Sequence, residues 1–321
     1  MALSFSVPDT ELSLTLHNRR AEVVDNIMQG TPFLAAMSNY GGVRSENGGY
    51  ELVVPVRMSK NSTAGSFSGY DILDTTPQDN ETSARYEWAG EYATISISWM
   101  EEKRNQGRGR LINLLNQKIT DAGDSIRDKL NVHLLQSQPA AGSKDPNSIT
   151  EIIDEVPTAD PSRTTSIGSI GNAQTWWRNK YTTGAAFTIA DMNAMWNDVS
   201  DGSDFPQFLL TSSTIYEYYE NSQVGQIRYA SVGTANAGFQ NLVYKTAPIM
   251  WDPQIGNTDE LYYINTKYFQ LAVHPDGDFV TTDFIEPDNQ AAKTAKILWM
   301  GQLICSNRRR CGTLHGITAP A

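Results

Sequence analysis

The sequence has few of the residues from which disulfide frameworks and metal sites are built. Its two cysteines, Cys305 and Cys311, do not have the spacing of a CxxC redox or zinc pair and are too few for a disulfide framework. No histidine has a neighbour two to four positions further on that we expect to complete a metal pair. The histidines are His17, His133, His274 and His315. We therefore predict two ordinary reduced thiols, no metal and no cofactor.

Long apolar runs and an excess of positive charge are also absent. No stretch approaches the ~20 uninterrupted apolar residues of a membrane helix, and the start lacks the basic head and apolar core of a secretory signal. We therefore expect no membrane contact and a protein that works in the cytosol where it is made. The net charge is −11, with 36 acidic and 25 basic residues, which argues against a DNA-binding domain. Such a charge suits a surface that lies near DNA without binding it.

Complete catalytic motifs are missing as well. Gly107-Arg108-Gly109 begins like a dinucleotide fingerprint, but no glycine completes it and no clear βαβ strand precedes it. No GxSxG nucleophile elbow occurs. The seven tryptophans and 36 acidic residues would allow a carbohydrate cleft with an acid/base pair, so a soluble carbohydrate-active hydrolase stays an alternative. We predict no catalytic residue, and hence no enzyme.

The first forty residues predict an N-terminal arm. Residues 21–37 favour a short helix with apolar residues on one side, and Gly30 and Pro32 are expected to end it. Nothing in this segment is large enough to form a core by itself. We therefore expect the arm to rest on something else.

Residues 41–99 are typical of a long β-hairpin. Tyr50–Arg57 has the composition of a strand, and its Pro55 suits a sheet edge. The return strand is expected through 84–88 and 92–99, and the segment between is rich in Ser, Thr, Gly and Asp. Two strands alone share one edge and no core, so the hairpin is predicted to pack on another surface, that of another subunit.

A helix of unusual length follows the hairpin. No proline occurs from Arg110 to Gln138, and at ~1.5 Å per residue such a helix spans about 40 Å. Apolar residues recur every three or four positions. They are Leu111, Leu115, Ile119, Ala122, Ile126, Leu130 and Leu134. A long helix across one globular core accounts for this pattern equally well.

The rest of the chain predicts a mixture of shorter elements, and the overall class is α+β. Residues 139–187 are irregular, with an island at Trp176–Asn179. Helices are expected at Thr188–Val199, which Thr188 can cap, and at Ser213–Asn221. Strands are expected at residues 208–210, 261–264, 269–273, 278–284 and 296–305.

Several segments, taken in order, resemble the major capsid proteins of tailed bacteriophages. Ser68–Asp79 looks like the tip of that family's extended loop, and Trp99–Glu102 looks like the start of its spine helix. Trp176–Lys180 is similar to a motif that follows the spine helix. Residues 293–301 and 307–317 look like the closing strand and terminus. Together they span most of the chain in the family's order.

The resemblance implies a fold, which is shared with encapsulins, and a division of the chain. The implied parts are an N-terminal arm (1–40), an extended β-hairpin loop (41–99), a peripheral domain with the spine helix (100–205, completed by 266–305), an axial domain (206–265) and a C-terminal segment (306–321). In this architecture the extended loop lies on the adjacent subunit, which would supply the surface that the predicted hairpin needs.

The resemblance also implies a function and partners. Copies of the chain would assemble into hexamers and pentamers of an icosahedral virion shell around double-stranded phage DNA, without specific DNA binding. Assembly would take place in the cytoplasm of the bacterial host. Because the chain lacks a long N-terminal helical extension, we expect a separate scaffolding protein, and we also expect a portal and a decoration protein. An encapsulin-type nanocompartment with enzyme cargo is the alternative within the same fold.

Two surface segments are the candidates for contacts between subunits. One is the loop tip, and the other is a basic run in an acidic chain that could pair with acidic surfaces of neighbouring copies. The candidate residues are Tyr70, Asp74, Thr75, Thr76, Pro77, Gln78, Asp79, Arg308, Arg309 and Arg310.

Overall fold

The computed structural model describes residues 31–104, 108–136, 143–154, 166–171, 173–223, 242–288 and 290–320. The helix expected before Gly30 lies outside these residues. The described chain begins with helix α3 (Pro32–Asn39), which has Pro32 in its first turn. Proline is tolerated there because the first N–H groups of a helix have no intrahelical partner. The expectation that Pro32 ends a helix was therefore wrong, because a helix begins at it.

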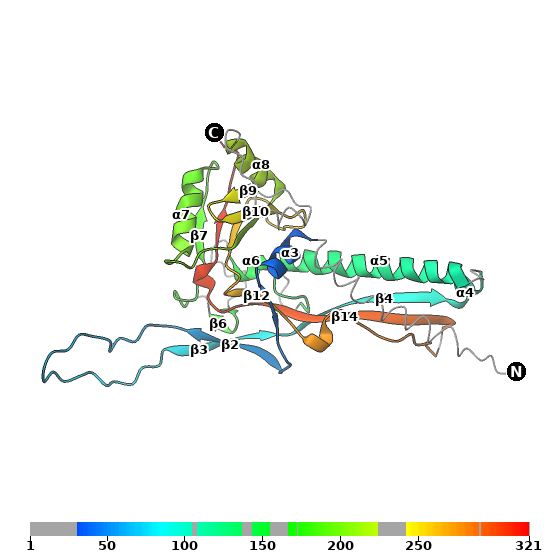
Figure 1. The fold of residues 1–321 in the computed structure, drawn as a ribbon, viewed down its shortest axis with the longest axis horizontal. Helices are drawn as coiled ribbons and strands as arrows, with labels where there is room; N and C mark the ends of the chain where they lie inside the picture. The colour runs from blue at the N-terminus through cyan, green and yellow to red at the C-terminus, as the bar shows by residue number, and fades with distance from the viewer. Residues whose placement is uncertain are drawn as a thin grey trace.

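The strands of the described residues form two main sheets, seen in Figure 1 as a long lower ribbon and an upper block. The first sheet contains β1 (Val43–Ser45), β12 (Phe269–Val273), β14 (Ala292–Cys305), β13 (Val280–Thr281) and β4 (Ala89–Ser98). The second contains β7 (Lys180–Thr183), β15 (Gly312–His315), β11 (Leu261–Ile264), β8 (Phe208–Thr211), β10 (Ala247–Trp251) and β9 (Leu242–Tyr244). The chain passes from the first sheet to the second between β4 and β7, returns to the first after β11, and passes to the second again after β14.

The long ribbon is the pair β4 and β14, covered on one side by helix α5 (Arg108–Leu135). The short helix α4 (Trp99–Arg104) joins β4 to α5. Ile95 and Ile97 of β4 are buried toward this helix, and its predicted apolar face is buried from Ile119 to Leu134. The long-helix prediction is confirmed. No helix among the described residues is both long and apolar enough to cross a membrane.

The hairpin consists of β2 (Glu51–Arg57) and β3 (Glu81–Glu87), paired in antiparallel register from Glu51↔Glu87 to Arg57↔Glu81. The prediction of its return strand was half right. Residues 92–98 do form a strand, but within β4, which pairs with β14. A period of two identifies a strand without naming its partner.

The paired part of the hairpin packs on its own chain. Its inner face is buried, and the small hairpin of β5 (Ser166–Ile167) and β6 (Ile170–Gly171) lies against it. The Arg85 amide donates to the Gly168 carbonyl at 2.9 Å, and a Cβ on Gly168 would lie 2.8 Å from the Ala84 Cβ. Another subunit is therefore not needed to cover the hairpin's base, which corrects the sequence expectation.

The second sheet has its own core, formed with helices α7 (Ile189–Val199) and α8 (Ser213–Ser222). Both helices were predicted, and Thr188 caps α7 by accepting from the Asp191 amide at 3.1 Å. Residues of α7 pack in this core although the predicted boundary before the axial domain follows residue 205. The one-turn helix α6 (Ile149–Ile152) precedes the second sheet in the chain.

Candidate contact surfaces

The loop between β2 and β3, residues 58–80, projects away from the body (Figure 1). It carries large apolar side chains that are exposed to solvent: Phe67 is 69% exposed, Tyr70 105% and Ile72 99%. Burying one side chain of this size stabilises by roughly 1.5–3 kcal/mol. Exposed apolar groups gathered on one projecting segment are typical of a contact surface.

The base and tip of this loop are held by local hydrogen bonds. The Met58 amide donates to the Asn80 carbonyl at 2.8 Å, and the Ser62 hydroxyl donates to the Gln78 side chain at 2.9 Å. At the tip, the hydroxyl and amide of Thr76 both donate to Asp74. These two bonds, the hydroxyl's first, hold the pKa of Asp74 below its usual value. The loop is therefore partly preorganised, with an ionised carboxylate at its tip.

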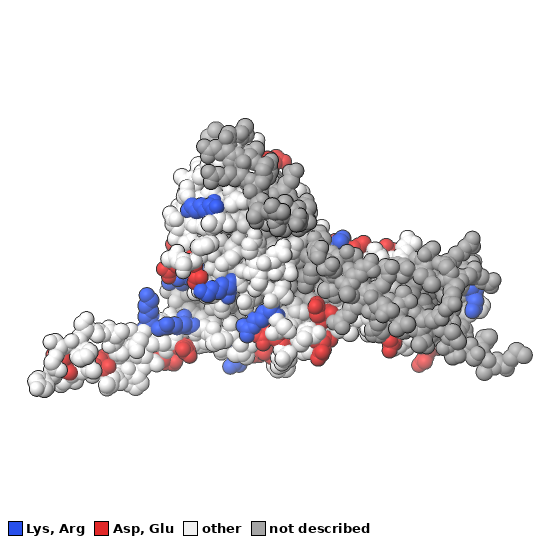
Figure 2. Space-filling model, in the orientation of Figure 1, with Lys and Arg blue, Asp and Glu red and all other residues white. Residues whose placement is uncertain are grey.

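All seven predicted contact residues of the loop, Tyr70 and the run from Asp74 to Asp79, are exposed. The loop has three aspartates and one lysine and is acidic overall. Figure 2 shows acidic atoms along the loop and basic atoms gathered where the hairpin meets the body. The loop therefore presents both apolar and negatively charged groups.

The three arginines of the basic run lie in different environments. Arg308 is 1% exposed, and its guanidinium donates to the Ile152 carbonyl at 2.7 Å and to the Asn179 side chain at 3.1 Å. Arg310 forms an ion pair with Asp201, whereas Arg309 is exposed. Arg308 cannot meet a neighbouring subunit from inside the fold, so the structure removes it from the candidate contacts.

The Trp176–Lys180 motif has an internal role that sequence reasoning missed. Asn179 links Arg308 to residue Asp154, because its amide donates to the Asp154 carbonyl at 2.7 Å. Trp177 is buried and donates to the Ile167 carbonyl at 3.0 Å. The run of adjacent tryptophans before an asparagine was the available signal, because large aromatic residues with one polar atom are suited to buried sites.

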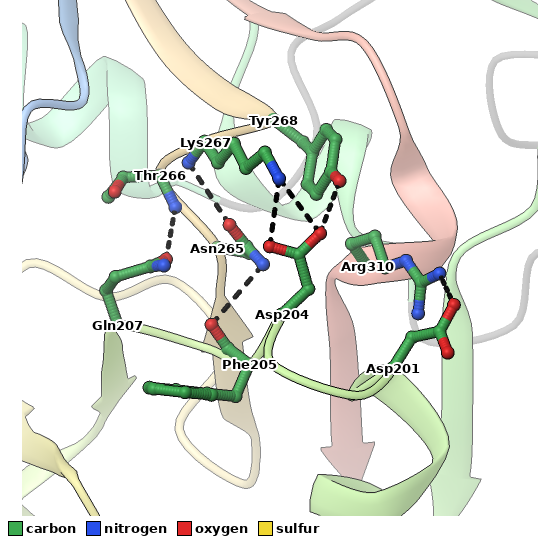
Figure 3. Close-up of polar contacts among 9 residues, drawn as sticks. All are labelled: Asp201, Asp204, Phe205, Gln207, Asn265, Thr266, Lys267, Tyr268 and Arg310. Carbon is green, nitrogen blue, oxygen red and sulfur yellow. Dashed lines mark hydrogen bonds and ion pairs between the residues drawn. The ribbon is translucent and has the colours of Figure 1, made fainter. Parts of the chain in front are cut away.

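A cluster of polar contacts joins the two sheets (Figure 3). We call residues 201–207, 265–268 and 306–311 the sheet junction. Asp204 accepts from the Tyr268 hydroxyl at 2.6 Å and from Lys267 at 3.1 Å. These two groups, Tyr268 first, hold the pKa of Asp204 below its usual value. Asn265 donates to the Phe205 carbonyl at 3.3 Å. The segment after α7 thus fastens the β11–β12 connection.

The second connection between the sheets is fastened in the same place. The Ser306 amide donates to the Tyr268 carbonyl at 2.9 Å, and Figure 3 shows the ion pair of Arg310 with Asp201 beside the first cluster. The Thr266 amide donates to the Gln207 side chain at 2.8 Å. The β11–β12 and β14–β15 connections are therefore both bonded to their surroundings, and these bonds help to fix how the two sheets sit relative to each other.

The outer face of the β4–β14 ribbon, on the side away from α5, is the second apolar surface. Tyr92 and Leu298 lie directly opposite each other in the register, and both are exposed. Lys296 is exposed on the same face, two residues from Leu298. We call these three residues and their strands the ribbon face. It combines an apolar pair with a positive charge.

Lys118 lies at the open edge of the ribbon, beside β4. Lys118 of α5 donates to the Ser96 carbonyl at 2.7 Å and to Glu101 at 2.8 Å, beside a cavity of about 550 Å³ between β4 and α5. The Ser96 carbonyl therefore points away from β14. A charged side chain on an open strand edge discourages pairing with foreign strands.

Comparisons with known proteins place these features in a family. The family model described as SU10 major capsid protein matches residues 92–318. No protein of curated function matches the sequence.

Solved structures share the fold at low sequence identity. The capsid asymmetric unit of cyanophage A-1(L) has a TM-score of 0.72 at 15% identity, covering 91% of this chain and 94% of that one. The capsid of a native GTA particle has a TM-score of 0.61 at 9% identity, covering 88% and 90%. The SrpI encapsulin of Synechococcus elongatus has a TM-score of 0.55 at 8% identity, covering 86% and 85%. The predicted α+β shell fold is confirmed.

Proposed function

This chain belongs to the SU10 major capsid protein family, and we propose that its projecting loop joins neighbouring copies of it into the shell. The prediction of a phage capsid shell subunit, a structural component of the virion, is confirmed by this membership. Copies of the chain self-assemble into a shell. The carbohydrate-hydrolase alternative has no support and is dropped.

We propose that the copies form hexamers and pentamers of an icosahedral shell around double-stranded phage DNA, without specific DNA binding. The work is done by contacts between copies and requires no catalytic group. An acidic chain supports this view, because a strongly basic lining would hold packaged DNA and oppose its release.

The exposure of the loop's apolar side chains is the observation that carries the proposal. Phe67, Tyr70 and Ile72 contribute nothing to the core of their own subunit, since they lie in solvent. Covered by a neighbouring copy, three such side chains would supply several kcal/mol per contact, at roughly 1.5–3 kcal/mol each. The contact is repeated by every copy in the shell, so a modest energy per copy suffices.

We propose the ribbon face of the adjacent copy as the surface that receives the loop. Its exposed Tyr92–Leu298 pair offers an apolar patch, and Lys296 beside it offers a positive charge for the acidic loop. Of the basic run, Arg309 is retained as a further contact candidate because it is exposed. Complementary charge at such a contact favours correct pairing more than raw affinity.

Deleting Asn61–Asn80 tests the division of labour between loop and body. The deletion leaves a three-residue connection between β2 and β3, and the body contacts stay in place. We expect soluble, folded protein that sediments as small species and shows no shells by negative-stain microscopy. Normal shells from the deletion variant would contradict the proposal.

A finer variant separates apolar burial from loop length. Phe67→Ser, Tyr70→Ser and Ile72→Ser together should raise the protein concentration needed for shells by at least tenfold, while Ser66→Ala in the same loop should leave it unchanged. Each tenfold step corresponds to about 1.4 kcal/mol. Light scattering recorded at increasing protein concentration gives the concentration at which shells form for each variant.

The cargo and the other partners define a second set of tests. An encapsulin shares the fold, so the content of the shell must be tested directly. Particles isolated from host cells are assayed for nuclease-protected double-stranded DNA and for enclosed protein. We propose that the shell encloses DNA and that it assembles in the host cytoplasm. A separate scaffolding protein, a portal and a decoration protein rest on the sequence resemblance. Correctly sized closed shells from the chain expressed alone would remove the scaffolding protein from this account.

A further inference from the structure

Three potential metal ligands meet where the spine helix reaches the root of the hairpin. Glu91 comes from β4, His133 from the last turn of α5, and Asp145 from the segment before α6. The Nδ1 atom of His133 contacts Glu91 Oε1 and lies 3.7 Å from Asp145 Oδ1. One ligand atom from each residue lies within 4.8 Å of the other two.

The negative charge of the two carboxylates is unfavourable because the cluster is largely buried. The side chains of Glu91, His133 and Asp145 are 11%, 9% and 34% exposed. Across the described ranges, no lysine or arginine ion pair reaches either carboxylate, so even a protonated imidazole would leave one negative charge uncompensated. An uncompensated charge in a poorly solvated place is strongly unfavourable. A cation would remove this excess.

A path for a cation exists beside the cluster. Asp145 lines a cavity of about 730 Å³. Glu87, Asn147 and Gln302 line the same cavity. Asp145 is also the most exposed of the three ligands, whereas Glu91 and His133 lie deeper. A hydrated ion can therefore reach the cluster through Asp145 without opening the core.

We propose that Glu91, His133 and Asp145 bind one divalent transition-metal ion of the Zn²⁺ or Co²⁺ class. One imidazole nitrogen and two carboxylate oxygens form a donor set that these ions accept at roughly 2.0–2.2 Å, with water completing the coordination. Ca²⁺ and Mg²⁺ prefer oxygen ligands alone, so the imidazole disfavours them. This inference does not depend on how the loop docks.

The ion takes the place of a proton. A carboxylate only accepts, so in the metal-free subunit the His133 Nδ1–H donates to Glu91. On binding, Nδ1 loses this proton to solvent and Nε2 takes one up, so the ring stays neutral while the Nδ1 lone pair takes up the metal and each carboxylate turns an oxygen toward it. The ion would link β4, α5 and the segment before α6, and so stiffen the root of the hairpin.

Sequence spacing could not have predicted this site. Glu91 and His133 are 42 positions apart, and their meeting depends on the packing of α5 on β4. The expectation of no metal rested on spacing along the chain alone.

Titration of the chelator-treated full-length protein with CoCl₂ tests the site, followed by calorimetry and by the visible spectrum of bound cobalt. We expect one ion per chain and at least tenfold weaker binding in Asp145→Asn. His133→Gln should abolish binding. Two matched controls, Asp124→Asn on the exposed side of the same helix and His315→Gln, should bind as the parent does.

Circular dichroism shows whether each variant is folded. If His133→Gln does not fold, Asp145→Asn alone tests the proposal, because Asp145 lies near the surface and its substitution is less disruptive. Absence of saturable cobalt binding by the parent protein would overturn the proposal. Equal binding by Asp145→Asn, or equal weakening by the two controls, would place the ion elsewhere and overturn it as well.

Discussion

The projecting loop and the sheet junction arrange their side chains in opposite ways. In the loop, apolar groups lie in solvent and hydrogen bonds join residues of the loop itself, as Ser62 does with Gln78. In the junction, polar groups from distant parts of the chain satisfy one another, as Asp204 does with Tyr268. The body therefore sets its own shape before assembly, whereas the loop has apolar surface left for a partner. We therefore propose that the fold of the subunit and the cohesion of the shell depend on different segments.

The buried arginine gives the largest expected effect on the body. Arg308→Met removes the guanidinium that bonds to Ile152 and Asn179 and leaves those acceptors inside the fold. We expect the free energy of unfolding to fall by roughly 2–4 kcal/mol, since hydrogen bonds to charged groups contribute about 1.5–3 kcal/mol each. Urea unfolding in the loop-deleted background, which keeps the subunit unassembled, measures it.

Arg309→Met is the matched control, because the neighbouring arginine is exposed. Its unfolding free energy should change by no more than about 0.5 kcal/mol. If both variants lost the same free energy of unfolding, the burial of Arg308 would not make its contribution to stability larger than that of Arg309.

The ribbon face should affect assembly and leave folding intact. Tyr92→Ser with Leu298→Ser removes the exposed apolar pair. We expect a rise of roughly tenfold in the concentration needed for shells, equivalent to about 1.4 kcal/mol, with little change in unfolding. Light scattering and urea unfolding separate the two outcomes. Unchanged assembly would direct the search for the receiving surface elsewhere.

A smaller effect is expected in the sheet junction, and it depends on pH. Asp204→Asn keeps the shape of the side chain but removes its charge beside Lys267. The pKa of Asp204 is lower in the folded state than in the unfolded chain. Its carboxylate therefore stabilises the folded state at pH values above the unfolded-state pKa. This stabilisation is lost as the pH falls through the folded-state pKa. At neutral pH we expect a loss of about 0.5–1 kcal/mol, the usual worth of a partly exposed pair.

Urea unfolding at neutral and acidic pH checks this prediction. The difference between parent and Asp204→Asn should shrink at acidic pH, while Glu217→Gln on α8 should show little difference at either pH. A difference that stays constant with pH would mean that charge on Asp204 is not its cause.

Features that are set by neighbouring residues could be predicted from the sequence. Features that depend on contacts between segments far apart in the chain could not. The apolar period of α5 and the Thr188 cap are local, and both predictions were confirmed. The pairing of β4 with β14 and the burial of Arg308 depend on segments far along the chain. An arginine in a basic run was expected at the surface because charged residues are rarely fully buried. The loop tip was predicted from the resemblance of Ser68–Asp79 to the family's extended loop, not from a local pattern.

The most direct test of the central claim is a high-resolution cryo-electron microscopy structure of the assembled shell. We predict that residues 58–80 lie on the ribbon face of the adjacent copy, with Tyr70 and Ile72 buried there near Tyr92 and Leu298. The same structure will show whether the body keeps the sheet junction described above. A shell in which these loop side chains remain in solvent, or fold back on their own subunit, would contradict the account.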